Sequence, residues 1–293
     1  MTKLALAGRE SAAGDEESRV LHRLDLTRGP TGEGRSPGPF VGVSVDVETT
    51  GLDFESDAII ELALRRFRYD AEGIVTDLDM SRSWLEDPRR SISLETTAIT
   101  GLTDADLVGR FVDDDIATAV LRSADLVVAH NSRFDRPWVE RRLEGATGLA
   151  WGCSMEQVDW RAAGFDGRGL GYLLCQAGWY HSGHRAAADA DAVVQLLRHR
   201  FPDGTTALSQ LVARTKRSSW VVTAVGADFG VKDLLRARGY RWDPVRRAWW
   251  REIVDEARLD EELWLARHVY APEAKPRAMG PEIEERTATT RFL

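Results

Sequence analysis

Two acids interrupt an apolar, valine-rich run in the first fifth of the chain. In VSVDVETTGL (43–52), Asp46 and Glu48 alternate with valines. Side chains alternate between the two faces of a strand, so the valines share one face and the two acids share the other. A buried carboxylate costs free energy unless something pairs with it. The run therefore predicts one of two things. It is a half-exposed strand with acids on its outer face, or it carries two metal ligands at a strand end, beside a tight turn over 49–51.

Composition places the chain among ordinary globular proteins. Its 293 residues are 43% hydrophobic and 29% charged, which suits one medium domain and a smaller one. Cys153 and Cys175 are too few for a disulfide framework, so we expect a reducing, cytoplasmic setting. No apolar run reaches membrane-spanning length and no signal peptide is recognisable, so we expect no membrane association. The net charge of −8 argues mildly against nucleic acid, but it averages over regions of different sign.

The pattern of elements predicts an α/β fold. Residues 1–38 are rich in Gly, Ser and mixed charges and predict a disordered leader. Alternating strands ending at Glu48 and over 58–70 and 73–85 suggest an antiparallel meander. They are followed by a helix (113–124), a buried strand (125–130), a helix capped by Asn131 (132–144), and helices over 170–178 and 184–201. We therefore expect a mixed central sheet flanked by helices over 39–201.

A second, smaller unit follows a polar connector. Residues 202–219 read as a linker, with one short helix at most. Residues 220–270 predict a strand, a helix, a strand–turn–strand hairpin and an amphipathic helix, which together form a small α+β module. Residues 271–293 read as a tail.

Two more acidic stretches share the chemical oddity of the first. Asp135 lies in the first turn of the helix after the buried strand, and His184 precedes Asp189 by five positions in a stretch of small residues. Taken alone, Asp135 could compensate the helix N-terminus and Asp189 could belong to a solvated helix face. His184 alone could be a capping or surface histidine, and nearby His181 competes with it for any catalytic assignment.

Three motifs, DVETTG (46–51), HNSRFD (130–135) and HRAAAD (184–189), occur in this order. Together they resemble the motifs of the DnaQ-like 3′–5′ exonucleases of the DEDD type, which have a ribonuclease H-like fold. The resemblance covers about residues 40–201. IIELA (59–63) and ITGLTDADL (99–107) also look like the family's second strand and its substrate-contacting loop, where Thr100 replaces the usual histidine. A histidine five residues before the last aspartate is typical of the histidine subclass (DEDDh), whereas the tyrosine subclass would have tyrosine in place of Ala186.

The resemblance implies a two-metal nuclease site. Two Mg²⁺ or Mn²⁺ ions stabilise the attacking and departing oxygens of a phosphodiester, and such hard cations prefer carboxylate ligands. Their charge would also make an acidic cleft attractive to phosphate. The implied metal ligands and catalytic acids are Asp46 (the bridging ligand), Glu48, Asp135 and Asp189. The implied general base is His184, and the implied substrate contacts are Thr49, Thr50, Gly51, Thr100, Asn131 and Phe134.

The leading hypothesis is a 3′–5′ exonuclease that releases nucleoside 5′-monophosphates, mainly from single-stranded DNA. A ribonuclease that trims RNA or short oligonucleotides stays open, because the family supports both. A non-catalytic nucleic-acid-binding protein is a further alternative, but a pure binder has no need for buried like charges. A DNA polymerase or another replication or repair protein is a conceivable partner that the motifs neither require nor exclude.

The C-terminal module combines basic and aromatic residues. Residues 214–251 carry ten Arg and Lys against three acids, interleaved with tryptophans. Cations for phosphates and aromatic faces for bases are typical of single-strand binding, although a small domain also needs tryptophans for its core. KDLLRARGYRWDPVRRAWW (232–250) resembles RWD/W-type accessory modules of some primases and annealing helicases. The expected nucleic-acid contacts are Arg246, Arg247, Trp249 and Trp250, with one tryptophan exposed and the other buried.

Overall fold

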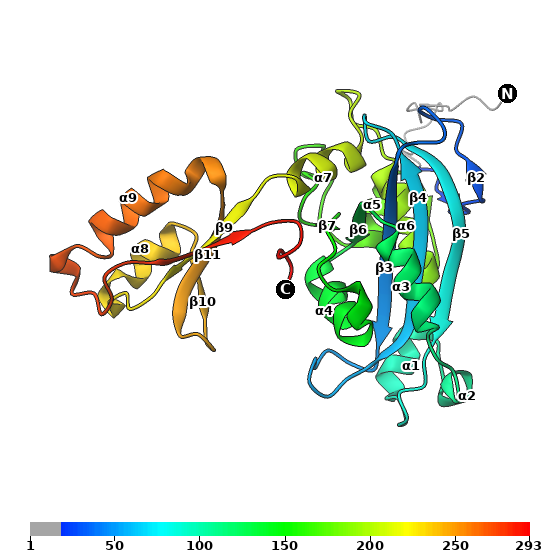
Figure 1. Cartoon of the computed structure of the whole chain (residues 1–293), viewed down its shortest axis with the longest axis horizontal. Coiled ribbons are helices and arrows are strands. Elements are labelled where there is room, and N and C mark those ends of the chain that lie inside the picture. The colour runs from blue at the N-terminus through cyan, green and yellow to red at the C-terminus, as the bar shows by residue number, and fades with distance from the viewer. Residues whose placement is uncertain (1–18) are drawn as a thin grey trace, which may run out of the picture. The chain divides into compact units, whose positions relative to one another are not determined.

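The computed structural model describes residues 19–293, which form two compact units (Figure 1). The first unit ends at Val212 and also includes Phe292–Leu293, and the second is Ala213–Arg291. Each unit has its own hydrophobic core. In the described part of the chain, no helix is both long and apolar enough to cross a membrane.

The first unit contains the predicted mixed sheet. Strands β3 (Phe40–Thr49), β4 (Ile59–Tyr69) and β5 (Val75–Leu85) form the expected antiparallel meander. Strands β6 (Leu126–Ala129) and β7 (Trp151–Cys153) add to β3 in parallel, which completes the order β2-β5-β4-β3-β6-β7. The expectation of a mixed α/β sheet is confirmed. Strand β7 was not predicted, because three residues are too few to show a period.

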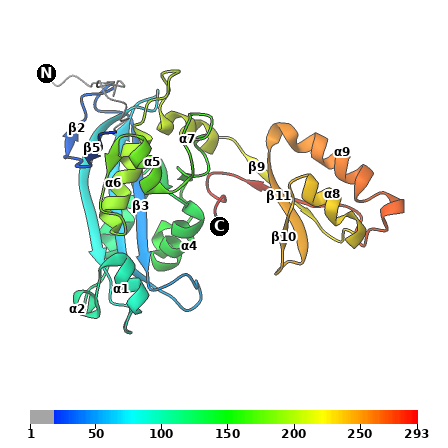
Figure 2. The same ribbon diagram turned by 180° about the vertical axis from the view of Figure 1, so that it is seen from behind.

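Helices cover both faces of this sheet (Figures 1 and 2). Val43, Val45 and Val47 pack with α3 and α4 on one face, and α5, α6 and α7 cover the other. The helices are α1 (Leu94–Thr100), α2 (Asp104–Leu107), α3 (Asp114–Arg122), α4 (Ser132–Arg142), η1 (Glu144–Ala146), α5 (Leu170–Gln176), α6 (Ala186–Leu197) and α7 (Ala207–Thr215). The side of β3 opposite the valines, which carries Asp46 and Glu48, therefore faces α6.

Part of the expected leader and most of the expected linker are folded. Strand β1 (His22–Arg23) pairs with β8 (Trp179–Tyr180), and β2 (Gly29–Pro30) pairs with β5. The prediction of disorder is wrong for these residues, because neighbouring strands satisfy their backbone hydrogen bonds without any apolar periodicity of their own. Residues 1–18 lie outside the described part. In α7, Leu208 and Leu211 are buried in the core of the first unit.

The second unit is a four-stranded antiparallel sheet in the order β10-β11-β9-β12, with helices α8 and α9. Its elements are β9 (Ser219–Ala224), η2 (Phe229–Val231), α8 (Lys232–Ala237), β10 (Arg241–Asp243), β11 (Ala248–Val254), η3 (Asp255–Ala257), α9 (Arg258–His268), η4 (Pro272–Ala274) and β12 (Glu282–Arg286). The predicted strand, helix, hairpin and helix are all present.

The prediction of a tail over 271–293 is wrong. Residues 282–286 form β12 against β9, and Ile283 packs on the core of the module. Phe292 is 2% exposed within the core of the first unit, where the Arg133 guanidinium lies 5.4 Å from its ring centroid. The sequence EIEER hides this strand because only one of its side chains is apolar.

Candidate metal centre and active site

The end of β3 supplies the first two acids of the site. Asp46 lies opposite Ala63 on β4, and Glu48 lies opposite Glu61. The register between the two strands shifts directly after Glu48, where the chain leaves the sheet. Because residues 46 and 48 are two apart on one strand, their carboxyl groups point to the same side, toward α6.

Two helices bring the other acids to this point. Oxygens of Asp46, Glu48 and Asp189 all lie within 4.8 Å of one another. Asp189 comes from α6, whose Ala186 and Ala190 allow close approach to Ala63 of β4. Asp135, in the first turn of α4, accepts a hydrogen bond from the Val47 N–H through Oδ1 at 3.2 Å. The four acids predicted from three separate motifs therefore gather around the end of one strand.

The acids destabilise one another's charged forms. Burial raises the pKa of Asp46 well above its ordinary value, and the charges of Asp135, Asp189, Glu48 and Glu61 raise it further. Burial, with Asp189 and Glu61, raises the pKa of Glu48 to about 7. Burial also raises the pKa of Asp135 to about 7, against the opposing effect of the Val47 N–H. Because ionisation of all these acids together is unfavourable, the cluster is suited to bind a cation, whose charge offsets theirs.

One cavity of about 240 Å³ adjoins all four acids. Its walls also include Leu170 and four further residues of the motifs HNSRFD and HRAAAD. The lining residues are Asp46, Val47, Glu48, His130, Asn131, Phe134, Asp135, Leu170, His184 and Asp189. Predicted residues Asn131, Phe134 and His184 thus share the cavity with the carboxylates. Asn131 stands before α4 at a φ of 110° and makes no side-chain cap, contrary to the capping role expected for it.

The two competing histidines occupy different positions. His184 lines the cavity, is exposed, and has a φ of 62°, which is uncommon outside glycine. His181 is not in the lining set, and its Nε2 lies 2.7 Å from Asp189 Oδ1. The structure therefore places His184 at the cavity and His181 in contact with Asp189.

His130 lines the cavity without having been predicted as a site residue. Its Nε2 lies 2.7 Å from the Arg168 carbonyl oxygen and its Nδ1 lies 2.8 Å from Ser154 Oγ. Burial lowers the pKa of His130 to about 4, so the ring is neutral. Since a carbonyl can only accept, Nε2 carries the proton and Nδ1 accepts from Ser154. The sequence feature that could have identified His130 is its position in the HNSRFD motif.

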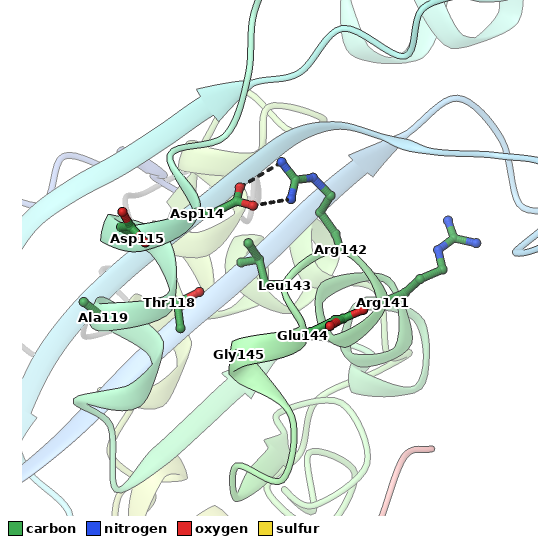
Figure 3. Close-up of a pocket in the computed structure, with 9 residues that line it drawn as sticks. All are labelled: Asp114, Asp115, Thr118, Ala119, Arg141, Arg142, Leu143, Glu144 and Gly145. Atoms are coloured by element: carbon green, nitrogen blue, oxygen red, sulfur yellow. Dashed lines mark hydrogen bonds and ion pairs between the residues drawn. The ribbon is translucent and has the colours of Figure 1, made fainter.

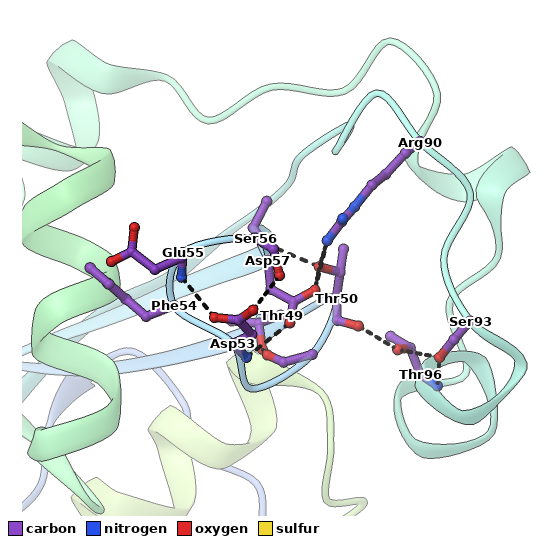
Figure 4. Close-up of polar contacts among 12 residues, drawn as sticks. Thr49, Thr50, Asp53, Phe54, Glu55, Ser56, Asp57, Arg90, Ser93 and Thr96 are labelled. Atoms are coloured by element: carbon purple, nitrogen blue, oxygen red, sulfur yellow. Dashed lines mark hydrogen bonds and ion pairs between the residues drawn. The ribbon is translucent and has the colours of Figure 1, made fainter. Parts of the chain in front are cut away.

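The predicted substrate-contacting turn follows Glu48 directly and is braced by a polar network (Figure 4). The Thr50 hydroxyl donates to Asp57 Oδ1 at 2.7 Å, and Arg90 Nη2 donates to both residues at 2.6 and 2.7 Å. Thr96 of α1 donates to the Thr50 carbonyl at 2.9 Å. A Cβ at Gly51 would lie 2.4 Å from Asp57 Oδ2, so a larger residue would displace the carboxylate that braces the turn.

Thr100 is the one predicted contact that turns toward its own helix. It is 5% exposed, its hydroxyl donates to the Thr96 carbonyl at 2.9 Å, and it accepts from the Leu102 N–H at 3.2 Å. A threonine at a helix end commonly bonds back in this way. Thr49, Thr50 and Gly51 adjoin the acids in the chain, but the lining of the cavity itself comes from other residues.

Glu61 is a fifth buried acid that the sequence reasoning missed. It is 1% exposed and accepts hydrogen bonds from the Ser83 hydroxyl, the Ala186 N–H and the Arg185 guanidinium at 2.9 to 3.3 Å. It therefore ties the start of α6, next to His184, to the sheet. The sequence feature that could have identified Glu61 is an acid inside the apolar run IIELA. Asp46 and Glu48 were recognised by the same feature.

A larger hollow of about 600 Å³ lies elsewhere on the first unit, between α3 and the end of α4 (Figure 3). Of its two arginines, Arg141 and Arg142, the latter is ion-paired with Asp114 at 2.9 Å and with Glu86 at 2.7 Å. Its lining shares no residue with the acid-lined cavity. Since three acids, Asp114, Asp115 and Glu144, stand against two arginines in its lining, this hollow is a weaker candidate for binding an anionic substrate.

In the second unit, the four predicted contacts do not share one face. Cross-strand pairing places Trp249 beside Trp242, and Trp250 beside Thr223 on the opposite face. Both tryptophans are half-buried, so the expected split into one exposed and one buried side chain is not observed. Arg246 forms an ion pair with Glu282 at 3.0 Å, and Arg247 occupies the hairpin turn with a φ of 50°.

Comparison with known proteins finds relatives that match only part of this chain. The chain is 27% identical to ribonuclease T of Shewanella frigidimarina over 119 residues, which are 36% of this chain and 53% of that protein. It is 31% identical to the PolC-type DNA polymerase III of Thermotoga petrophila over 111 residues, 37% of this chain and 8% of that protein. A structure of exonuclease I aligns with a TM-score of 0.47 at 14% identity, covering 86% of this chain and 63% of that one.

The chain thus spans about half the length of the ribonuclease T relative that it matches. The match to a family model covers a longer part of the chain than the match to either relative, and it includes all four acids and His184. Residues 43–197 match the RNase T family, which is described as exonuclease, and the chain therefore belongs to this exonuclease family of the ribonuclease H-like superfamily.

Proposed function

We propose that the chain is a metal-dependent 3′–5′ exonuclease that hydrolyses phosphodiester bonds, mainly of single-stranded DNA, and releases nucleoside 5′-monophosphates. The observation that carries the proposal is one cavity lined by Asp46, Glu48, Asp135, Asp189 and His184. Family membership supports the same chemistry, since the matched residues include all five.

The donor set fits hard divalent cations. Every ligand is a carboxylate, and Mg²⁺ and Mn²⁺ prefer oxygen ligands. We propose that Asp46, Glu48, Asp135 and Asp189 hold two such ions, with Asp46 shared between them. When bound, the ions would lower the pKa of the attacking water and stabilise the leaving 3′-oxygen. They would also offset the mutual repulsion that raises the pKa of the acids.

The side chains around the acids would perform the remaining tasks. His184, exposed at the cavity, would accept a proton from the attacking water, since histidine is the side chain that most often acts as a general base. Glu61 would keep that histidine in place through Arg185 and the start of α6. The braced turn at Thr50 and the side chains of Asn131 and Phe134 would hold the terminal nucleotide.

A ribonuclease acting on RNA ends is the second candidate function. It is supported by the similarity to a protein named ribonuclease T, whereas the similarity to a DNA polymerase supports DNA. The latter similarity is also our reason for proposing a polymerase or another replication protein as a partner.

The free thiols Cys153 and Cys175 are consistent with the proposed cytoplasmic location.

The test uses single strands of one sequence made as DNA and as RNA. Wild-type protein in Mg²⁺ should degrade at least one of them, with DNA degraded faster, and EDTA should stop the reaction. Asp189→Asn should reduce turnover by at least 10²-fold, while the matched control Asp115→Asn, an exposed acid of α3, should leave it unchanged. Activity in EDTA, or an active Asp189→Asn protein, would contradict the proposal. Faster degradation of RNA would favour the ribonuclease instead.

A further inference from the structure

A continuous row of cations and aromatic rings lies along α8 and β10 of the second unit. Lys232 Nζ lies 3.9 Å from the ring centroid of Phe229, and Arg236 follows Lys232 one helical turn later. The Arg236 guanidinium carbon lies 5.8 Å from the Trp249 ring, and the Trp249 and Trp242 rings are 5.6 Å apart. These five residues are called the basic–aromatic ridge.

The ridge exposes aromatic surface that a monomeric domain has no packing reason to expose. Phe229 is 77% exposed and Trp242 is 49% exposed, although the same unit buries other aromatic rings in its core. Arg236 forms an ion pair with Asp233 at 3.3 Å, with both side chains mostly in solvent. Such an exposed pair is weak and leaves Arg236 able to bind a phosphate.

The opposite face of the sheet carries acids that the ridge lacks. Side chains alternate along β11 and β12, so Glu252, Glu282 and Glu284 share the face of Trp250. Two cations close to these acids are engaged, since Arg246 pairs with Glu282 at 3.0 Å and Arg286 pairs with Glu284 at 3.1 Å, whereas Arg241, opposite Trp250, is exposed. The acids make Trp250 and Arg246 weaker candidates for contacting a polyanion than the ridge.

We infer that the basic–aromatic ridge binds single-stranded nucleic acid, with bases stacked on Trp242 and Phe229 and phosphates held by Lys232 and Arg236. The choice of nucleic acid as the occupant rests on the exonuclease function proposed above. Two cations flanked on both sides by aromatic rings can bind the phosphates and the bases of an unpaired strand. Binding there ties a substrate to the chain that hydrolyses it and raises its effective concentration at the active site.

The experiment measures binding of a labelled 20-nucleotide strand to the full-length protein by fluorescence anisotropy, in Ca²⁺ to suppress cleavage, at two salt concentrations. DNA and RNA strands of one sequence form the two arms. Trp242→Ala should weaken binding about tenfold, and Trp242→Phe should keep most of the affinity because a stacking ring remains. Lys232→Ala combined with Arg236→Ala should lower the slope of log affinity against log salt by about 1.4, roughly 0.7 per lost phosphate contact.

The matched control is Arg246→Ala combined with Arg247→Ala in the hairpin turn, which removes the same charge from outside the ridge. It should change affinity less than twofold. The inference would be overturned if Trp242→Ala and the Lys232→Ala/Arg236→Ala double variant both bound with unchanged affinity. A loss of binding confined to the control would also overturn it. Thermal unfolding checks that each variant is folded, and both Trp242 variants alter an exposed side chain.

Hydrolysis of a trinucleotide in Mg²⁺ separates this inference from the proposed function. Ridge variants should hydrolyse it at the wild-type rate, because the ridge is outside the catalytic residues. A protein that fails to hydrolyse it but still binds long strands through the ridge would refute the exonuclease proposal alone. A protein that hydrolyses it normally, with affinity for long strands insensitive to the ridge, would refute the ridge alone.

Discussion

Replacing Asp46 with asparagine should make the metal-free protein more stable while abolishing its activity. Asp46 is half-buried among Asp135, Asp189 and Glu48, each of which raises its pKa. Burial, the largest cause, and the neighbouring charges together oppose ionisation of Asp46 in the folded state. Asparagine carries no charge, so the variant does not pay this penalty. Since one pKa unit corresponds to about 1.4 kcal/mol, we expect the substitution to recover about 1–2 kcal/mol.

The sign of the pH dependence follows from these raised pKa values. An acid whose pKa is higher in the folded than in the unfolded state opposes folding once it ionises. Wild-type protein in EDTA should thus lose stability as pH rises from about 4, where the unfolded acids titrate, to about 7, where Glu48 and Asp135 titrate when folded. The advantage of Asp46→Asn should accordingly be small at pH 5 and full at pH 8.

Differential scanning calorimetry is the assay, because it can resolve the transition of the first unit. For a unit of this size, 1–2 kcal/mol corresponds to a rise in Tm of about 2–8 °C at pH 8 in EDTA. Mg²⁺ should raise the Tm of wild type and have little effect on the variant. Asp115→Asn, an exposed acid, is the control and should behave as wild type. A lower Tm for Asp46→Asn in EDTA at pH 8 would show that the four acids do not repel one another as argued.

Three further substitutions test individual parts of the site and of the fold. His184→Ala should lower turnover by about 10²–10⁴-fold, while His181→Ala has a milder effect; assays at saturating Mg²⁺ compare them, and the reverse ranking would make His181 the base. Glu61→Ala should destabilise the first unit by about 3 kcal/mol in chemical denaturation, because it leaves buried donors and the Arg185 charge unpaired, and Glu61→Gln should recover part of the loss. Phe292→Ala should cost about 3 kcal/mol in the same measurement, since the ring is buried in the core of the first unit; an unchanged midpoint would mean that the packing of Phe292 contributes little.

The site was largely predictable because its chemistry contradicts its surroundings. Asp46 and Glu48 stand out in a valine strand, and strand alternation alone fixes their common direction. Asp135 and Asp189 could not be brought to them by local reasoning, since 40 or more positions separate the motifs along the chain. The family resemblance supplied that step, and the structure places all four around one cavity. Glu61 carried the same signal within IIELA and was overlooked because no motif contained it.

The parts of the fold that sequence reasoning missed are short strands defined by their partners. β1, β2 and β12 receive their hydrogen bonds from β8, β5 and β9, and their own residues show little periodicity. Thr100 was assigned to the substrate by position in a motif, whereas its hydroxyl bonds to its own helix. Trp249 and Trp250 do lie on opposite faces, but the exposed ring of the pair of strands is Trp242, which the strand edge leaves uncovered.

Direct identification of the product is the measurement that tests the exonuclease proposal most closely. A single-stranded oligonucleotide labelled at its 5′ end, incubated with wild-type protein and Mg²⁺, should shorten through a ladder of one-nucleotide steps. The same strand labelled at its 3′ terminal nucleotide should release the label first, as a nucleoside 5′-monophosphate. Early release of the 5′ label, internal cuts without a ladder, or a nucleoside 3′-monophosphate product would contradict hydrolysis from the 3′ end at the four-carboxylate site.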